Sequence, residues 1–296
     1  MRVLILGGGG MLGHKLSQVL RGRFETWVAV RSDYSSYARY SLFERDRMIS
    51  GVDAFNFDTV LRAFEIAHPD AVVNAIGIIK QLPSAKDPIA SLTVNALFPH
   101  RLAALCRATG ARLIQISTDC VYSGQPGRNR PYIERDAPDP SDLYGRSKLL
   151  GEVDQAGCLT IRTSIIGREL TTSSGLVEWF LGRSNETVFG YTNAIFSGLP
   201  TLRLSSIIAN TLERHPSLEG LYHVSADPIS KYDLLHLIRD AYSIPIEIEP
   251  RSDVRIDRAL NSARFREATG YRPKPWPDLI KEMAADPTPY DEWRQR

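Results

Sequence analysis

Short apolar runs rich in β-branched residues alternate with longer amphipathic segments through the first half of the chain. This pattern predicts buried strands at residues 3–6, 27–30, 71–75 and 112–116, and helices at residues 11–20, 59–67 and 88–109. Asp58 begins the second helix, Gly110 ends the third, and Pro99 predicts a kink within the third. Strands and helices in this order predict parallel βαβ units, and therefore an α/β fold.

The pattern changes in the second half of the chain. Glycine, proline and charged residues dominate residues 123–140, which predicts an irregular surface loop before a helix at 141–154 and a strand at 159–165. Further helices are expected at 176–181, 204–212 and 231–242, with a strand at 221–224. We therefore expect a doubly wound parallel sheet of the Rossmann type over residues 1–166, with strands between 190 and 225 as candidates to rejoin it. A smaller C-terminal α/β lobe over residues 167–296 would mainly bind substrate.

Composition narrows the class of protein. The 296 residues are 43% hydrophobic and 24% charged, and the formal charge of +2 gives no sign of a nucleic-acid partner. No apolar stretch approaches the roughly 18 residues of a membrane span, so no membrane partner is expected. The three cysteines lack C-x-x-C spacing, which indicates a reducing compartment, and we expect the cytoplasm. No histidine pair has the spacing of a metal site, so no metal is predicted.

A glycine-rich turn directly follows the first predicted strand. Gly7, Gly10 and Gly13 form G-x-x-G-x-x-G and open the first predicted helix. Glycine lets the chain turn tightly and lets a pyrophosphate approach the backbone, while the helix N-terminus offers unpaired N–H groups. This arrangement predicts a dinucleotide-binding site.

The end of the second predicted strand bears on the choice of dinucleotide. An acidic residue there would bind the ribose 2′-hydroxyl of NAD, whereas this chain has Arg31 and Ser32. A guanidinium can bind the extra phosphate of NADP, so NADP(H) is favoured over NAD(H), although Asp33 follows two positions later.

Tyr144 and Lys148 form a Y-x-x-x-K pair within the helix expected at residues 141–154. The i, i+4 spacing places both side chains on one helix face, where an ammonium would favour the phenolate and bring the tyrosine pKa toward neutrality. Thr118 ends an upstream strand, where its hydroxyl could bind a carbonyl oxygen while Tyr144 donates a proton to it. These three residues are the predicted catalytic set.

These motifs together resemble those of an extended short-chain dehydrogenase/reductase, most closely the dTDP-4-dehydrorhamnose reductase branch of nucleotide-sugar reductases. The resemblance rests on the glycine turn, residues 74–77 (N-A-I-G), 117–124 (S-T-D-x-V-Y-S-G), 144–152 (Y-G-R-S-K-L-L-G-E) and 159–164 (L-T-I-R-T-S). It is strong over residues 1–166 and weak beyond them. It implies that Thr118 polarises a sugar ketone, Tyr144 is the general acid, and Lys148 holds the nicotinamide ribose.

The resemblance also implies where the cofactor lies. The cofactor-binding residues would be Gly7, Gly10, Met11, Leu12, Gly13, Arg31, Ser32, Asp53, Ala75, Ile76 and Gly77, together with Tyr144 and Lys148. Asp53 matches a position near the adenine, and Asn95 matches a helix position that is structural or part of a proton relay, with structure favoured. Relatives commonly form homodimers.

Two departures from the branch bear on the reaction. Relatives that dehydrate nucleotide sugars carry Asp-Glu after the threonine, whereas this chain has Asp119 and Cys120, so simple carbonyl reduction is favoured. The stretch from Gly77 to Gln81 resembles a subgroup that reduces UDP-linked 2-acetamido-6-deoxy-4-keto-hexoses in O-antigen or capsule pathways. Lys80 in this stretch is either a substrate contact or a solvated loop lysine.

The remaining substrate candidates are polar residues that could contact a nucleotide-linked sugar: Lys80, Asp119, Asn193, Arg203 and Arg258. The leading hypothesis is NAD(P)H-dependent reduction of a nucleotide-linked 6-deoxy-4-keto-hexose of the dTDP-4-dehydrorhamnose or UDP-2-acetamido type. Two alternatives are a nucleotide-sugar epimerase with tightly bound NAD and a non-catalytic cofactor-binding regulatory subunit.

Overall fold

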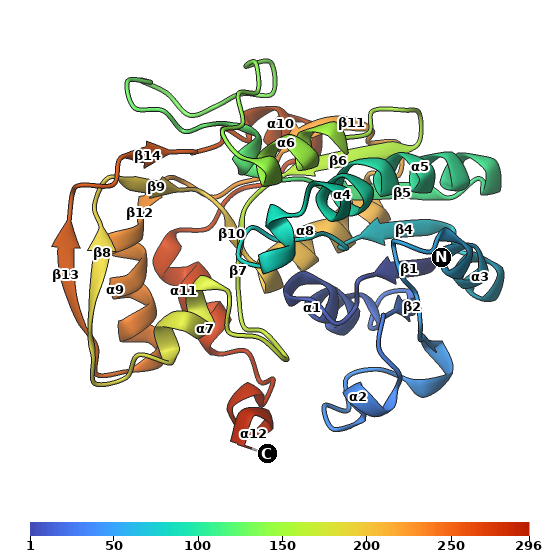
Figure 1. Ribbon diagram of the computed structural model, residues 1–296, viewed down its shortest axis with the longest axis horizontal. Helices are drawn as coiled ribbons and strands as arrows, with labels where there is room; N and C mark the ends of the chain where they lie inside the picture. Colours follow the sequence, from blue (N-terminus) through green and yellow to red (C-terminus); the bar gives the residue numbers. More distant parts are fainter. Residues whose placement is uncertain (296) are drawn as a thin grey trace.

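The computed structural model describes residues 1–295 and has a seven-stranded parallel sheet at its centre (Figure 1). The order across this sheet is β11-β6-β5-β4-β1-β2-β3, and every neighbouring pair is parallel. Its strands are β1 (Arg2–Leu6), β2 (Glu25–Ala29), β3 (Met48–Ile49), β4 (Ala71–Asn74), β5 (Arg112–Ile116), β6 (Cys158–Arg162) and β11 (Gly220–His223). The predicted Rossmann-type α/β fold is confirmed.

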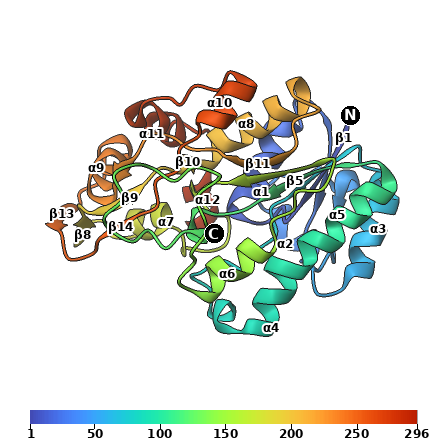
Figure 2. The ribbon, with the colours of Figure 1, turned by 90° about the horizontal axis from the view of Figure 1, so that it is seen from above.

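Helices cover both faces of the sheet (Figure 2). On one face α1 (Met11–Leu20) packs beside α8 (Thr201–Arg214), and on the other lie α3 (Phe57–Ala67) and α5 (Phe98–Thr109). Side chains of β1 alternate between the two layers: Val3 and Ile5 join the core around α1, while Leu4 and Leu6 join the core around α3 and α5. A strand that is buried on both faces has a continuous apolar sequence, as residues 3–6 of β1 do.

The helix expected at residues 88–109 is continuous but not uniform. It consists of α4 (Pro88–Ser91), a π-helical segment (Leu92–Leu97) and α5, and Gly110 ends it in the left-handed conformation. Pro99 lies in the first turn of α5, directly after the π-helical turn, so its missing N–H is accommodated without ending the helix. By length and composition alone the 22 residues Pro88–Thr109 could cross a membrane, since an 18-residue window of them has a mean hydropathy of 1.2, but 56% of that window is buried inside the protein.

A second lobe stands beside the sheet, where Figure 1 shows α9 (Lys231–Tyr242) next to the paired strands β8 (Thr187–Tyr191) and β13 (Glu247–Arg251). A three-stranded sheet connects this lobe to the rest: β12 (Ile229–Ser230), β9 (Ala194–Phe196) and β14 (Ile256–Asp257). The other elements are α7 (Leu176–Leu181), α10 (Ala263–Thr269), α11 (Trp276–Ala284), α12 (Tyr290–Gln295) and the short α2 (Ser35–Ala38).

Several element ends differ from the prediction. Asn56, not Asp58, caps α3, because its side chain accepts the N–H of Asp58. Helix α6 spans only Leu143–Leu150, since Asp142 caps one end and Gly151 follows the other. The strand expected at 159–165 ends at Arg162, and a separate β7 (Ile165–Ile166) pairs with β10 (Leu199–Pro200) instead. A 3₁₀ turn, Asp119–Val121, was not predicted; it follows β5 and turns the chain at the candidate site.

Candidate active site

The glycine turn forms a close contact between β1 and α1. Gly7 has a φ of 86°, and the Gly10 N–H donates to the Gly7 carbonyl at 3.0 Å. A Cβ on Gly13 would lie 2.0 Å from the Gly7 oxygen, so only glycine lets α1 approach the turn this closely. Gly10 is exposed and α1 has no side-chain cap, which leaves its first N–H groups open. This cradle fits the pyrophosphate of a dinucleotide.

The turn after β4 joins the glycine turn to the catalytic helix. A Cβ on Gly7 would lie 3.0 Å from atoms of Ala75 and Ile76, and one on Gly77 would lie 3.9 Å from the Lys148 Nζ. Buried Asn95 fixes this turn: its Oδ1 accepts the Ile78 N–H at 2.9 Å, and its Nδ2 donates to the Ile78 carbonyl at 3.0 Å. Asn95 therefore has the structural contacts that were favoured for it.

Helix α6 brings Tyr144 and Lys148 to the end of β5. Gly145 permits this approach, since a Cβ there would lie 2.2 Å from the Cys120 carbonyl oxygen. The Lys148 Nζ donates to the Ile116 carbonyl at 2.7 Å, one residue before Ser117 and two before Thr118. Thr118 is buried and lies within reach of the Tyr144 phenol. The structure therefore brings the three predicted catalytic residues together.

Burial controls the charge of this set. It raises the pKa of Tyr144 above its ordinary range, and the nearby Thr118 hydroxyl only partly opposes this effect. Burial also lowers the pKa of Lys148 to about 8, opposed by the Glu152 carboxylate. The expectation that Lys148 brings the Tyr144 pKa toward neutrality is thus not met: burial dominates the shift, and the Lys148 ammonium donates to the Ile116 carbonyl.

The segment after Thr118 contains an acid and a thiol. Asp119 is 8% exposed, accepts the Thr118 hydroxyl at 3.2 Å, and has a pKa raised by burial. Cys120 accepts the Arg258 Nη1 at a Sγ distance of 3.7 Å, and burial raises its pKa to about 12. Cys120 therefore stays a neutral thiol at physiological pH and does not replace the missing carboxylic acid.

A buried ion pair holds α6 against the sheet. Arg162 on β6 donates from Nε and Nη2 to the two Glu152 oxygens, both at 2.7 Å. Glu152 also accepts the Ser117 hydroxyl at 2.7 Å, beside Thr118. The Arg162 Nη1 continues to the Tyr122 hydroxyl at 2.6 Å. Glu152 and Arg162 stand in two separate sequence motifs, residues 144–152 and 159–164, and the fold brings them into contact.

The predicted adenosine contacts lie on the surface near the glycine turn. Arg31 and Ser32 are exposed after β2, and no carboxylate forms a salt bridge with Arg31 within residues 1–295. Asp53 is half-buried, and its Oδ1 accepts the Phe55 N–H at 3.0 Å. Tyr37 was not predicted, but a Cβ on Gly9 would lie 2.4 Å from its hydroxyl, which therefore covers part of the turn.

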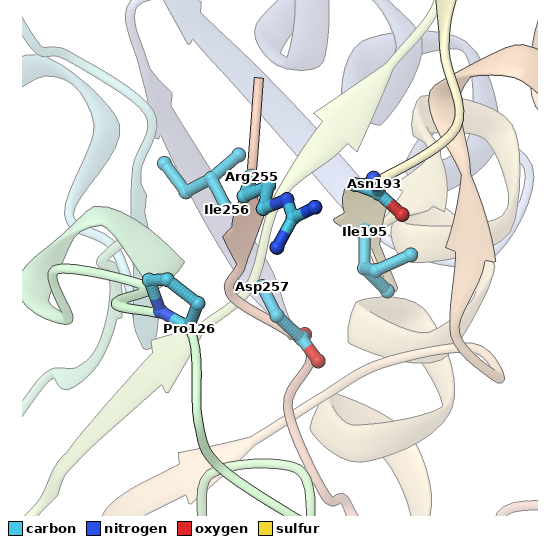
Figure 3. Close-up of a pocket in the computed structure, with 6 residues that line it drawn as sticks. All are labelled: Pro126, Asn193, Ile195, Arg255, Ile256 and Asp257. Atoms are coloured by element: carbon cyan, nitrogen blue, oxygen red, sulfur yellow. The ribbon is translucent and has the colours of Figure 1, made fainter. Parts of the chain in front are cut away.

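The substrate candidates are not all brought together. Exposed Lys80 forms a salt bridge of 2.6 Å with Asp142, the residue that caps α6. Asn193 donates to the Ser252 carbonyl at 3.2 Å. It lines a hollow of about 370 Å³ with Pro126, Ile195, Arg255, Ile256 and Asp257, and none of the catalytic residues (Figure 3). Arg203 on α8 has its guanidinium 6.0 Å from the Tyr271 ring centroid.

Arg258 turns toward the catalytic residues. Its Nε donates to the Tyr122 carbonyl at 2.8 Å, while the neighbouring Asp257 lines the hollow. Lys231, the first residue of α9, also lies close enough to Asp119 for their charges to affect each other's pKa. Sequence analysis missed Lys231. The available signal was a cation at a helix N-terminus, which the helix dipole disfavours.

The family model described as RmlD substrate binding domain matches residues 1–287. The chain belongs to the RmlD substrate binding domain family. Together with the fold, this membership makes it an extended short-chain dehydrogenase/reductase and an NAD(P)H-dependent oxidoreductase that uses a nicotinamide cofactor.

Relatives of this RmlD-family chain carry different names. The dTDP-4-dehydrorhamnose reductase of Mycolicibacterium smegmatis is 33% identical over 151 residues, covering 51% of this chain and 40% of that protein. The methionine adenosyltransferase 2 subunit beta of Danio rerio is 26% identical over 267 residues, covering 82% and 75%. The structure of a hypothetical dTDP-4-dehydrorhamnose reductase from Sulfolobus tokodaii has 26% identity and a TM-score of 0.77, covering 93% and 98%.

Proposed function

We propose that the protein reduces the 4-keto group of a nucleotide-linked 6-deoxy-4-keto-hexose in cell-surface polysaccharide biosynthesis. The substrate would be of the dTDP-4-dehydrorhamnose or UDP-2-acetamido-2,6-dideoxy-4-keto-hexose type. The observation that carries this proposal is the convergence of Thr118, Tyr144 and Lys148 at the end of β5, beside the glycine turn.

The catalytic residues have complementary tasks in this reaction. The reduced nicotinamide, when bound, supplies the hydride that C4 of the sugar receives. Tyr144 donates its phenolic proton to the keto oxygen, and the Thr118 hydroxyl donates a hydrogen bond to the same atom. The raised pKa of Tyr144 keeps that proton in place before the reaction. Lys148 then stabilises the phenolate that remains and holds the nicotinamide ribose through its ammonium.

The chemistry around Thr118 supports reduction rather than dehydration. Removal of water from the sugar needs an additional acid and base, and relatives that perform it carry a glutamate where this chain has Cys120. The raised pKa of Cys120 prevents it from acting as an acid near neutral pH.

We propose NADPH as the preferred cofactor, supported by the exposed Arg31 just after β2, which forms no salt bridge within residues 1–295. Residues 1–166 would bind this cofactor, with β11 completing their sheet, and residues 167–296 would mainly bind the nucleotide sugar. The three free cysteines support a cytoplasmic location, and a homodimer is the proposed assembly.

The decisive test is a panel of dTDP- and UDP-linked 4-keto-6-deoxy sugars, with and without a 2-acetamido group, assayed by absorbance of NADPH and NADH. Turnover is expected with at least one substrate, faster with NADPH. Arg31→Ala should weaken NADPH binding and leave NADH binding nearly unchanged. Tight retention of NAD through purification, with interconversion of hydroxyl epimers and no net oxidation, would instead identify an epimerase.

A second candidate is a non-catalytic regulatory subunit, favoured by the match to methionine adenosyltransferase 2 subunit beta over 82% of this chain. This candidate predicts cofactor binding, no turnover across the panel, and a stable complex with a partner enzyme. The intact catalytic set weighs against it, because cofactor binding alone does not require Thr118 and Tyr144 to converge.

A further inference from the structure

Lys231 occupies a position that its own helix disfavours. The N-terminus of α9 carries the positive end of the helix dipole, and Lys231 is its first residue. Asp233 in the same turn is already engaged, because it accepts the Ser230 hydroxyl at 2.7 Å. Within residues 1–295 no carboxylate forms a salt bridge with Lys231. A residue placed against local preference in this way is typical of a functional site.

The surroundings hold the Lys231 ammonium in place. Its Nζ lies 3.9 Å from the centroid of the Phe196 ring, and the side chain is half-buried. Ser230 pairs with Ile195 in the β12–β9 ladder, which fixes the backbone next to this contact. Burial lowers the pKa of Lys231 to about 8, and the Asp119 carboxylate opposes that shift.

Arg258 is a second cation that lies near Asp119, as Lys231 does. Its guanidinium contacts the Tyr122 carbonyl and the Cys120 Sγ, and no salt bridge involves it in the described chain. Asp119 is the carboxylate common to both, and it forms a salt bridge with neither. Arg258 also lies near the Asp142 carboxylate, but Lys80 already forms a salt bridge with that group. The cations around Asp119 and Asp142 therefore outnumber the carboxylates by one, and a bound anion would balance this charge.

We propose that Lys231 and Arg258 bind the diphosphate of the nucleotide-sugar substrate. This inference rests on the proposed function, which places the C4 keto group at Thr118. In a hexopyranose C1 lies across the ring from C4, so the C1-linked phosphate is held away from Thr118 by the width of the sugar ring. Lys231 and Arg258 lie near Asp119 and Cys120, which follow Thr118 in the chain, and a diphosphate carries the two negative charges that they would pair with.

Binding of nucleoside diphosphates tests this assignment without any turnover. Calorimetric titration of UDP and dTDP into the NADPH-saturated protein should give a Kd about tenfold higher or more in Lys231→Met than in the unaltered protein. Methionine keeps an apolar side chain over Phe196, so the fold should persist, and a thermal melt checks this. Lys231→Arg should restore part of the affinity. Lys281→Met, which removes an exposed lysine of α11, is the matched control and should change nothing.

The other outcomes are equally distinct. Unchanged UDP and dTDP affinity in a folded Lys231→Met protein would overturn the assignment, as would failure of the unaltered protein to bind either nucleotide. A raised KM for the keto-sugar with unchanged diphosphate affinity would place Lys231 at the sugar and also overturn it. Conversely, Lys231-dependent UDP binding without reduction of any keto-sugar would overturn the proposed function and leave the diphosphate site standing.

Discussion

Replacing Gly13 with alanine sets two effects of known size against each other. In a helix interior alanine is favoured over glycine by about 1 kcal/mol, so propensity alone predicts a more stable protein. The new Cβ, however, would lie 2.0 Å from the Gly7 oxygen and 2.7 Å from the Gly7 carbonyl carbon. This is about 1.4 Å closer than an ordinary van der Waals contact, and the atoms that the Cβ meets belong to rigid backbone. Overpacking of this kind costs about 1 to 3 kcal/mol or more. Helix α1 must then retreat from the turn.

Because the clash is with rigid backbone we take the upper end of that cost, about 3 kcal/mol, and subtract the gain of about 1, so Gly13→Ala should lose about 2 kcal/mol of unfolding free energy. It should also weaken NADPH binding more than tenfold, because the N–H cradle opens. Urea unfolding and fluorescence titration measure the two effects. Gly10→Ala is the matched variant: its Cβ meets only the Gly7 oxygen, at 3.4 Å, so stability should hold while cofactor affinity falls. Gly22→Ala meets no atom within 4 Å and should change neither. A Gly13→Ala protein as stable as the unaltered one would refute the argument.

Substitutions of Tyr144, of Arg162 and of the buried His14 test the catalytic site and the packing around it. Tyr144→Phe should lower kcat by about 10²-fold or more while the Kd for NADPH, from fluorescence titration, stays within twofold. Arg162→Met should lower the free energy of unfolding in urea by about 3 kcal/mol, because it leaves the largely buried Glu152 carboxylate without a cation and with only the Ser117 hydroxyl as a partner; a loss below about 1 kcal/mol would contradict this. Burial lowers the pKa of His14 from 6.5 to about 4, so its neutral form stabilises the fold above pH 6.5, and this contribution is lost as the pH falls toward 4. The unfolding free energy of the His14→Gln variant, measured between pH 6.5 and about 4, should therefore depend less steeply on pH than that of the unaltered protein.

The sequence predicts the parts of the site that depend on local geometry. The glycine turn follows from its place between strand and helix, and Tyr144 and Lys148 share a face because i and i+4 do so in any helix. Thr118 could be placed because parallel strands end at the same edge of a sheet. In each case a few neighbouring residues and one rule of secondary structure are sufficient.

Contacts between distant segments are what the sequence leaves undetermined. Lys231 comes more than a hundred residues after Asp119, and its place depends on the short strands β9, β12 and β14, which carry too few residues for a periodic signal. The same strands direct Arg258 toward Cys120 while Asn193 lines the hollow, although sequence analysis grouped both as substrate candidates. No spacing rule distinguishes these two outcomes, because each depends on which face of a two- or three-residue strand is covered.

The protonation state of Tyr144 shows why burial must be known before chemistry is assigned. From sequence, Lys148 is expected to favour the phenolate and to bring the Tyr144 pKa toward neutrality, with Tyr144 as the general acid. In the structure burial raises the pKa of the phenol, so Tyr144 stays neutral, and lowers the pKa of Lys148 to about 8, so Lys148 remains mainly an ammonium near neutral pH. A neutral phenol is an acid that still holds its proton, which is what reduction of a ketone requires at the start. The environment created by α6, β5 and the Glu152–Arg162 pair therefore keeps the Tyr144 proton available for donation, as the proposed reduction requires.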